Sequence, residues 1–202
     1  MENVYLIVGL GNPGKEYAGT RHNAGFLLAE KLGERWHASW SREKKFSARV
    51  AKVERGGQKI ILSQPQTFMN ASGEAVAALK NFYQIADNKI LIVVDDADLP
   101  LGEIRMRGSG SSGGHHGLES IEQHLATRNF ARLRIGIGRR DSDGRQITNY
   151  VLGEFSAEEQ KLVEKILTRA TEQIECWLRD GIEKAMSQFN GAIDAPTKKG
   201  KQ

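Results

Sequence analysis

Apolar residues along the chain follow two patterns, one typical of strands and one typical of helices. Short runs, either continuous or alternating with polar residues, predict strands at residues 4–8, 46–54, 59–63, 89–95, 103–107 and 132–138. The run at 89–95 is the strongest, and its continuous apolar character is typical of a central parallel strand buried on both faces. Segments 46–54 and 59–63 flank Gly56-Gly57 and predict an antiparallel hairpin. A further short extended piece is expected at 148–153, and it could become a lid.

Helical spacing, with apolar residues three or four positions apart, predicts the remaining elements. Helices are expected at 23–36, at 71–83, after the histidines near 116, from residue 156 onward and at 182–189. Asn70 stands at the N-cap position of the helix at 71–83. Ser156 and Glu159 form a capping box that opens a long helix. Helices and strands alternate, so the pattern predicts an α/β domain.

Length and composition narrow the class of protein. The 202 residues are enough for one domain with a sizeable core, assigned to 1–191. Residues 192–202 are expected to form a flexible basic tail. No apolar run is long enough to cross a membrane, and the start of the chain lacks a signal-peptide pattern. The single Cys176 allows no internal disulfide, so a cytoplasmic setting is expected.

The charge is modest but unevenly placed. The net charge is +4 at pH 7, with a pI near 9.2. Arginines gather in the second half, close to glycine loops, at Arg105, Arg107, Arg132, Arg134, Arg139, Arg140 and Arg145. Such a cluster fits either a footprint for a phosphate backbone or a solvated basic face, and charge alone does not decide between them.

The loop after the first strand imitates two nucleotide-binding motifs. Residues 9–14 have the G-x-G-x-x-G spacing of a dinucleotide site, but Pro13 and a further turn delay the helix that would hold the pyrophosphate. Residues 9–15 also imitate a P-loop, but Glu16 stands where a Mg²⁺-binding hydroxyl is required. Both motifs are therefore disfavoured.

A third interpretation of the same loop is a catalytic cleft. Its glycines would serve backbone geometry, while Asn12 and His22 project polar groups into the cleft and His22 acts as a base. Asp95 ends the strongest strand, at the edge where α/β sheets bind ligands, and a buried carboxylate there needs a donor partner. His115 and His116 follow a glycine-rich loop at a helix start.

Two further chemistries are disfavoured. Residues 110–114 have the letters of a nucleophile elbow around Ser112, but an acid and then a histidine do not follow in the required order. The acidic group at 95–98 has no His or Cys at a spacing that supports a metal site.

Six segments together resemble motifs of the bacterial-type peptidyl-tRNA hydrolase family, in family order. They cover most of residues 4–153. The segments are Gly9-Leu10-Gly11-Asn12-Pro13-Gly14, Thr20-Arg21-His22-Asn23-Ala24-Gly25, Thr67-Phe68-Met69-Asn70-x-Ser72-Gly73, Asp95-Asp96-x-Asp98-Leu99-Pro100-x-Gly102, Gly113-Gly114-His115-x-Gly117-Leu118 and Arg132-Leu133-Arg134-Ile135-Gly136-Ile137-Gly138.

The resemblance implies a fold and an activity. The fold would be a single α/β domain in three layers, with a mixed, mostly parallel, twisted sheet flanked by helices. The activity would be hydrolysis of the ester that joins a peptide to the 3′ ribose of tRNA, which recycles stalled peptidyl-tRNA. The family resemblance also implies a monomer and no metal or organic cofactor.

The resemblance also assigns roles to residues. His22 corresponds to the essential histidine and Asp95 to its partner carboxylate, so this pair would activate water. Asn12 and Asn70 correspond to amides that position substrate or water, and which of them stabilises the oxyanion stays open. The positions expected to bind substrate are Asn12, Tyr17, Phe68, Asn70, His115, His116, Arg105, Arg107 and Arg134, the arginines through tRNA phosphate.

One departure and two alternatives remain. The family commonly has asparagine where this chain has His116, and neutral histidine offers one donor and one acceptor instead of the amide set. A non-enzymatic RNA-binding relative of the intron-splicing type is the first alternative. Retention of Asn12, His22, Asn70 and Asp95 argues against it, as does the expected lack of a transit peptide. A nucleotide-binding oxidoreductase is the second.

Overall fold

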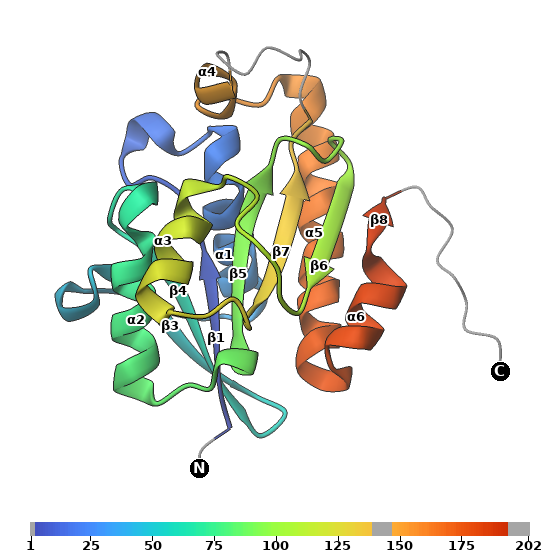
Figure 1. The fold of residues 1–202 in the computed structure, drawn as a ribbon. Helices are drawn as coiled ribbons and strands as arrows, with labels where there is room; N and C mark the ends of the chain where they lie inside the picture. Colours follow the sequence, from blue (N-terminus) through green and yellow to red (C-terminus); the bar gives the residue numbers. More distant parts are fainter. Residues whose placement is uncertain (1–2, 139–146, 194–202) are drawn as a thin grey trace, which may run out of the picture.

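The computed structural model describes residues 3–138 and 147–193. Eight strands form one twisted sheet in the order β2-β3-β4-β1-β5-β7-β6-β8 (Figure 1). The strands are β1 (Val4–Gly9), β2 (Trp40–Glu43), β3 (Ala48–Arg55), β4 (Gln58–Pro65), β5 (Ile90–Asp96), β6 (Glu103–Arg107), β7 (Ala131–Gly136) and β8 (Gly191–Ala192).

The centre of the sheet is parallel and its edges are antiparallel. Strand β1 pairs in parallel with β4 and β5, and β5 pairs in parallel with β7. Antiparallel pairs add β3 and β2 at one edge and β6 and β8 at the other. The mixed sheet with a parallel core and the hairpin of β3 and β4 are thus confirmed. Strand β2 was not predicted.

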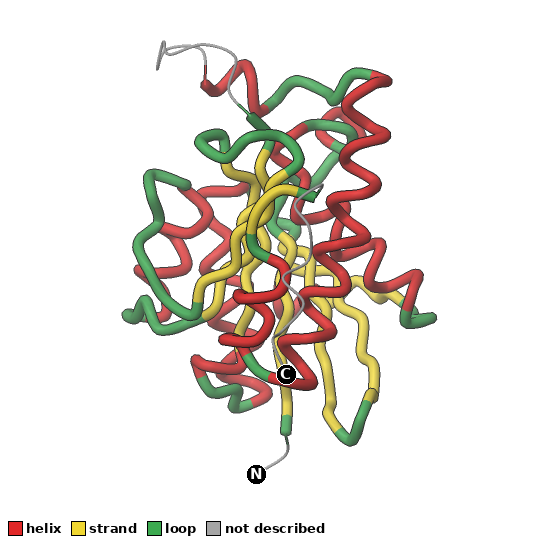
Figure 2. Tube along the Cα trace, turned by 90° about the vertical axis from the view of Figure 1, so that its right-hand side faces the viewer, coloured by secondary structure: helices red, strands yellow, loops and turns green. Residues whose placement is uncertain are grey.

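Helices cover both faces of this sheet, which confirms three layers. They are α1 (Ala24–Arg35), α2 (Ser72–Tyr83), α3 (His116–Leu125), α4 (Ile147–Val151), α5 (Ala157–Asp180) and α6 (Ile182–Phe189). Helices α1 and α5 share one hydrophobic core with the sheet, and α2 and α3 share the other. The side view in Figure 2 shows the strands between helices. None of the described helices combines the length and apolar character needed to cross a membrane.

Two glycines let α1 begin directly against the end of the sheet. A Cβ atom on Gly9 would lie 2.1 Å from the carbonyl oxygen of Gly25. A Cβ atom on Gly25 would lie 2.4 Å from the backbone nitrogen of Leu10 and 2.5 Å from the carbonyl oxygen of Val93. Side chains at either position would push the helix away, so these glycines set how close the turn before α1 lies to the carboxyl end of β5.

Three local expectations were wrong or need adjustment. The segment at 148–153 is not extended, because Ile147–Val151 forms the short helix α4, whose conformation depends on tertiary contacts. Asn70 is not an N-cap, because a 3-10 turn, Met69–Ala71, precedes α2 and places Ala71 at the cap. Ala192 belongs to β8 instead of the expected tail. Residues 194–202 of that tail and the basic loop at 139–145 lie outside the described residues.

Candidate active site

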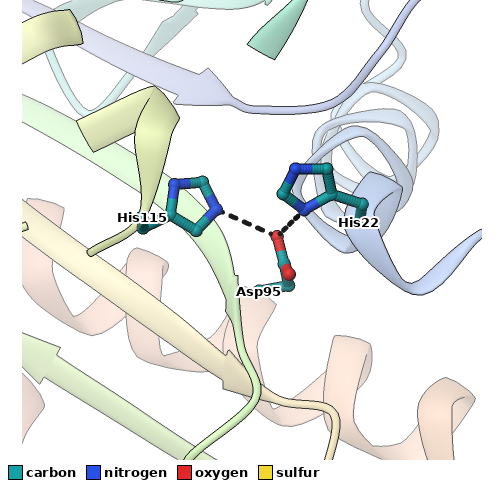
Figure 3. Close-up of side chains that lie close together, drawn as sticks. All are labelled: His22, Asp95 and His115. Carbon is teal, nitrogen blue, oxygen red and sulfur yellow. Dashed lines mark hydrogen bonds and ion pairs between the residues drawn. The ribbon is translucent and has the colours of Figure 1, made fainter. Parts of the chain in front are cut away.

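One buried carboxylate organises the carboxyl end of the sheet. Asp95, on β5, is 3% exposed, and its Oδ1 atom lies 2.9 Å from Nδ1 of His22 and 3.1 Å from Nε2 of His115 (Figure 3). His22 comes from the 3-10 turn Arg21–Asn23 before α1, and His115 caps α3. The two histidines therefore approach Asp95 from the two helical layers of the molecule. The expected contact between His22 and Asp95 is present.

The two hydrogen bonds of His115, at 3.1 Å to Asp95 and 3.4 Å from Leu118, indicate its tautomer. Its Nδ1 accepts from the backbone N–H of Leu118, as the N-cap of α3. Nδ1 therefore carries a lone pair, and Nε2 carries the hydrogen that is donated to Asp95. Both ring nitrogens are engaged, so neutral His115 has no nitrogen left to act as a base.

His22 has the opposite arrangement. Its Nδ1 donates to Asp95, which places the lone pair of the neutral ring on Nε2. In Figure 3 this second nitrogen lies on the side of the ring away from the carboxylate. His22 also lines the adjoining pocket, and its side chain is 17% exposed. Of the two histidines, His22 is the one that can take a proton from a bound molecule.

Asp95 stays ionised in this environment. Its burial by itself raises the pKa of the carboxyl group, but the hydrogen bonds from His115 and His22 outweigh that effect and lower the pKa well below its ordinary value. A permanent negative charge thus lies against both imidazole rings. That charge fixes the orientation of His22 and favours the imidazolium that forms when Nε2 takes a proton.

Asn12 is held in place by hydrogen bonds that the sequence did not predict. The buried side chain of Asn23 accepts from the backbone N–H of Asn12 and donates to its carbonyl oxygen, at 2.8 and 3.0 Å. The side-chain oxygen of Asn12 accepts from the backbone N–H of Met69 at 2.9 Å. Because that oxygen is engaged, the amide group of Asn12 is left to donate.

A pocket of about 350 Å³ joins these groups. It brings together six of the residues predicted for the site: Asn12, His22, Asp95, His115, His116 and Arg134. The apolar Val151 and Leu152, at and just after the end of α4, form part of its wall; they belong to the segment 148–153, which the sequence suggested as a lid. Gly113 and Gly114 line it too, and their φ angles of 62° and 79° explain why glycines precede His115.

Arg134 forms hydrogen bonds to two segments next to the pocket. Its guanidinium donates to Asp96 at 3.2 Å and to the carbonyl oxygens of Ser111 and Ser112, both at 3.0 Å. In the antiparallel register of β6 and β7, Arg105 is paired with Arg134, and Arg107 with Arg132. Paired residues on adjacent strands share a face of the sheet, so the exposed Arg105 and Arg107 extend a basic face outward from the pocket.

His116 stands at the mouth of the pocket. Its side chain is 77% exposed, and Nδ1 lies 3.0 Å from a carboxylate oxygen of Glu119, one turn further along α3. The remaining predicted residues do not line the pocket. Phe68 and Asn70 are exposed at the turn before α2, and Tyr17 is half-buried in the turn after β1.

The same three side chains could be considered as metal ligands. Ligand atoms of His22, Asp95 and His115 lie within 4.8 Å of one another. A metal ion would require lone pairs on the two nitrogens that face Asp95. In the hydrogen-bonded arrangement just described those nitrogens carry hydrogens, and the capping contact of His115, at 3.4 Å, agrees with that placement. The geometry favours a hydrogen-bonded acid–base centre over a metal centre.

Fold and site together define an α/β protein with a histidine–carboxylate acid–base centre at the carboxyl end of a parallel sheet. A family model described as "Peptidyl-tRNA hydrolase" matches residues 6–199. The chain therefore belongs to the peptidyl-tRNA hydrolase family.

Individual relatives agree with this assignment. A peptidyl-tRNA hydrolase of Gloeobacter violaceus is 46% identical over 185 residues, which is 92% of this chain and 93% of that protein. One from Caldanaerobacter subterraneus is 47% identical over 188 residues, 93% of this chain and 100% of the other. The crystal structure of peptidyl-tRNA hydrolase from Acinetobacter baumannii superposes with a TM-score of 0.89 at 39% identity, covering 95% of this chain and 97% of the other.

Proposed function

We propose that this protein hydrolyses peptidyl-tRNA at the ester between the peptide and the tRNA, releasing free tRNA and peptide. The observation that carries the proposal is the 2.9 Å contact between Nδ1 of His22 and Asp95, in a pocket of a chain that belongs to this family. In the cell the reaction would recycle stalled peptidyl-tRNA in the cytoplasm.

The chemistry follows from the tautomer of His22. Nε2 takes a proton from a water molecule while the water oxygen attacks the ester carbonyl, which becomes a tetrahedral oxyanion. Asp95 stabilises the imidazolium formed at this step. The intermediate then collapses, the bond to the 3′ oxygen of the ribose breaks, and that oxygen receives the proton from His22. Water supplies the new carboxyl oxygen, so the products are the peptide acid and the free tRNA.

A donor is needed for the oxyanion, and two asparagines are candidates. The amide of Asn12 lies at the pocket and can donate, since its oxygen is held by Met69. Asn70 is exposed at the turn before α2 and would have to contact the substrate from the rim. The geometry favours Asn12, and a donor of this kind typically contributes about 10²–10³ in rate.

The remaining predicted residues are proposed to bind the substrate around the proton-accepting His22. Arg105, Arg107 and Arg134 lie on one basic face suited to phosphate groups of tRNA. His115 and His116 border the pocket, and Tyr17, Phe68 and Asn70 would form more distant contacts. We further propose that the protein acts as a monomer and without a metal ion.

A turnover assay tests this function against the alternative of a non-enzymatic RNA-binding relative. Purified protein is mixed with a peptidyl-tRNA that carries an N-blocked peptide, and release of free tRNA is followed. The proposed function predicts catalytic turnover that survives dialysis against EDTA. Tight binding without hydrolysis would favour the RNA-binding alternative, and loss of activity on chelation, restored by a divalent ion, would contradict the metal-free mechanism.

A further inference from the structure

The residue next to the catalytic histidine contacts a different part of the molecule. Arg21 belongs to the same 3-10 turn as His22, but its guanidinium turns toward α4 and α5. It donates to the Glu159 carboxylate at 2.8 Å, and both side chains are 11% exposed. It also lies over the ring of Tyr150, with 4.4 Å between the guanidinium carbon and the ring centroid, and near that of Phe155 at 5.4 Å.

The backbone of the same turn makes a second connection to this region. The N–H of Arg21 donates to the carbonyl oxygen of Gly153 at 3.0 Å, and Thr20 forms an isolated antiparallel bridge with Glu154. Tyr150 adds a hydrogen bond from its hydroxyl to the carbonyl oxygen of Ile137. Arg21 thus contacts the segment 150–155 through its backbone N–H and through the face of its guanidinium, and it contacts Glu159 of α5, just beyond the segment, through an ion pair.

This segment contributes directly to the catalytic pocket. Val151 and Leu152 lie between Tyr150 and Gly153, both of which contact Arg21, and they supply apolar wall on the side of His22. A helix of five residues has little stability of its own, so the place of these two side chains depends on tertiary contacts. The ion pair and the ring contacts of Arg21 supply contacts of this kind.

We propose that Arg21 is a positioning residue that fastens the segment 150–155 over the pocket, so that Val151 and Leu152 hold their place beside His22. The inference rests on the proposed function for its catalytic meaning. Arg21 does not contact the substrate. It couples the turn that carries the catalytic histidine to the wall against which the substrate binds.

Kinetics of Arg21→Ala provide the first test. The acid–base centre is intact in this variant, so the pH profile of kcat should keep its wild-type shape. The apolar wall is loosened, so KM for peptidyl-tRNA should rise by about tenfold, as expected when the substrate no longer packs against one apolar side chain. A purely structural role would lower the melting temperature but leave KM unchanged.

Arg35→Ala is the matched control. Arg35, the last residue of α1, forms an ion pair with Glu175 near the other end of α5, at 2.9 Å and far from the pocket. Both ion pairs end on α5, but Arg35 starts from the last residue of α1, whereas Arg21 starts from the turn before that helix, and Arg35 contacts no pocket segment. This variant should keep the wild-type KM. An equal rise in KM for both variants, or no rise for Arg21→Ala, would overturn the proposal.

Two further measurements test the proposal if Arg21→Ala does not fold or if the wild-type protein shows no turnover. If Arg21→Ala does not fold, Glu159→Gln removes the charge while retaining an acceptor for Ser156 and Arg21, and it should raise KM in the same direction but less. Hydrogen exchange of residues 149–155 without substrate should accelerate in Arg21→Ala and not in Arg35→Ala. If the wild-type protein shows no turnover, the proposed function fails, and the exchange result alone decides whether Arg21 fastens the segment.

Discussion

At the scale of single residues, the site depends on two histidines that share one carboxylate oxygen but differ in their other nitrogen. His115 uses that nitrogen to cap α3, whereas His22 keeps it available at the pocket. The capping bond therefore leaves His22, and not His115, with an acceptor nitrogen available at the pocket. The buried Asp95 accepts from both and remains charged because their hydrogen bonds lower its pKa against the effect of burial.

Asp95→Asn should lower kcat while the protein remains folded. The amide cannot stabilise the imidazolium and can turn its own donor toward His22, which reverses the tautomer, so a loss of about 10²–10⁴-fold is expected. Single-turnover hydrolysis measures the rate, and thermal unfolding checks the fold. Asp87→Asn, at a carboxylate paired with Lys80 before β5, is a suitable control. A wild-type rate in Asp95→Asn would remove its orienting role.

At the scale of elements, the sequence predicted those whose patterns are local and long. Strand β5, the hairpin of β3 and β4, and the capping box of α5 were all predicted, because alternation, Gly-Gly turns and Ser-x-x-Glu spacing are local signals. Strand β2 and helix α4 were missed or misjudged. Each is only four or five residues long, so neighbouring elements decide its conformation.

The residues of the site divide in the same way, into those with a local sequence signal and those placed by long-range contacts. Motif resemblance found His22, Asp95 and His115, which the structure brings within hydrogen-bonding distance. Arg21 was missed as part of the site because its contact with Glu159 joins segments 138 residues apart in the chain. Leu152 was expected only as part of a lid segment at 148–153. Asn23 was taken only as a helix start, although its amide holds Asn12 on both sides. Such long-range contacts leave no periodic signal in a single sequence.

The exposed arginines of β6 should bind tRNA phosphate. Replacing Arg105 and Arg107 together by Ala should raise KM for full-length peptidyl-tRNA and flatten its dependence on salt, by about one unit of log–log slope for each phosphate that the two arginines neutralise. KM measured across a salt series checks this. The paired control is Lys161→Ala with Lys165→Ala, on an exposed face of α5 on the other side of the sheet. An unchanged slope in the arginine variant would indicate a merely solvated face.

At the scale of the whole molecule, the three-layer arrangement creates the site. The parallel strands end at one edge of the sheet, where the turn before α1 comes from one layer and the start of α3 from the other (Figure 1). Neither layer alone holds the acid–base centre. Asp95 lies between the two layers and accepts a hydrogen bond from each, so the same carboxylate should affect both catalysis and the stability of the fold.

Protonation of Asp95 should therefore contribute to the loss of stability in acid. The folded pKa of Asp95 is lower than its ordinary value of 3.8, so its contribution to stability is present well above pH 3.8 and is lost as the pH falls below that value toward the folded pKa. Denaturant unfolding between pH 6 and pH 2 should show a shallower acid decline for Asp95→Asn than for wild type. Glu158→Gln, at an exposed carboxylate in the first turn of α5, is the control. Parallel curves for wild type and Asp95→Asn would contradict the prediction.

We propose that Nε2 of His22 is the base that removes a proton from water, and single-turnover hydrolysis by His22→Ala at saturating enzyme is the most direct measurement of this role. Binding of the same peptidyl-tRNA is measured in parallel, with His124→Ala, an exposed histidine of α3, as control. The account predicts a rate lowered by about 10²–10⁴-fold or more with binding retained. Ester cleavage at a near wild-type rate in His22→Ala would contradict it.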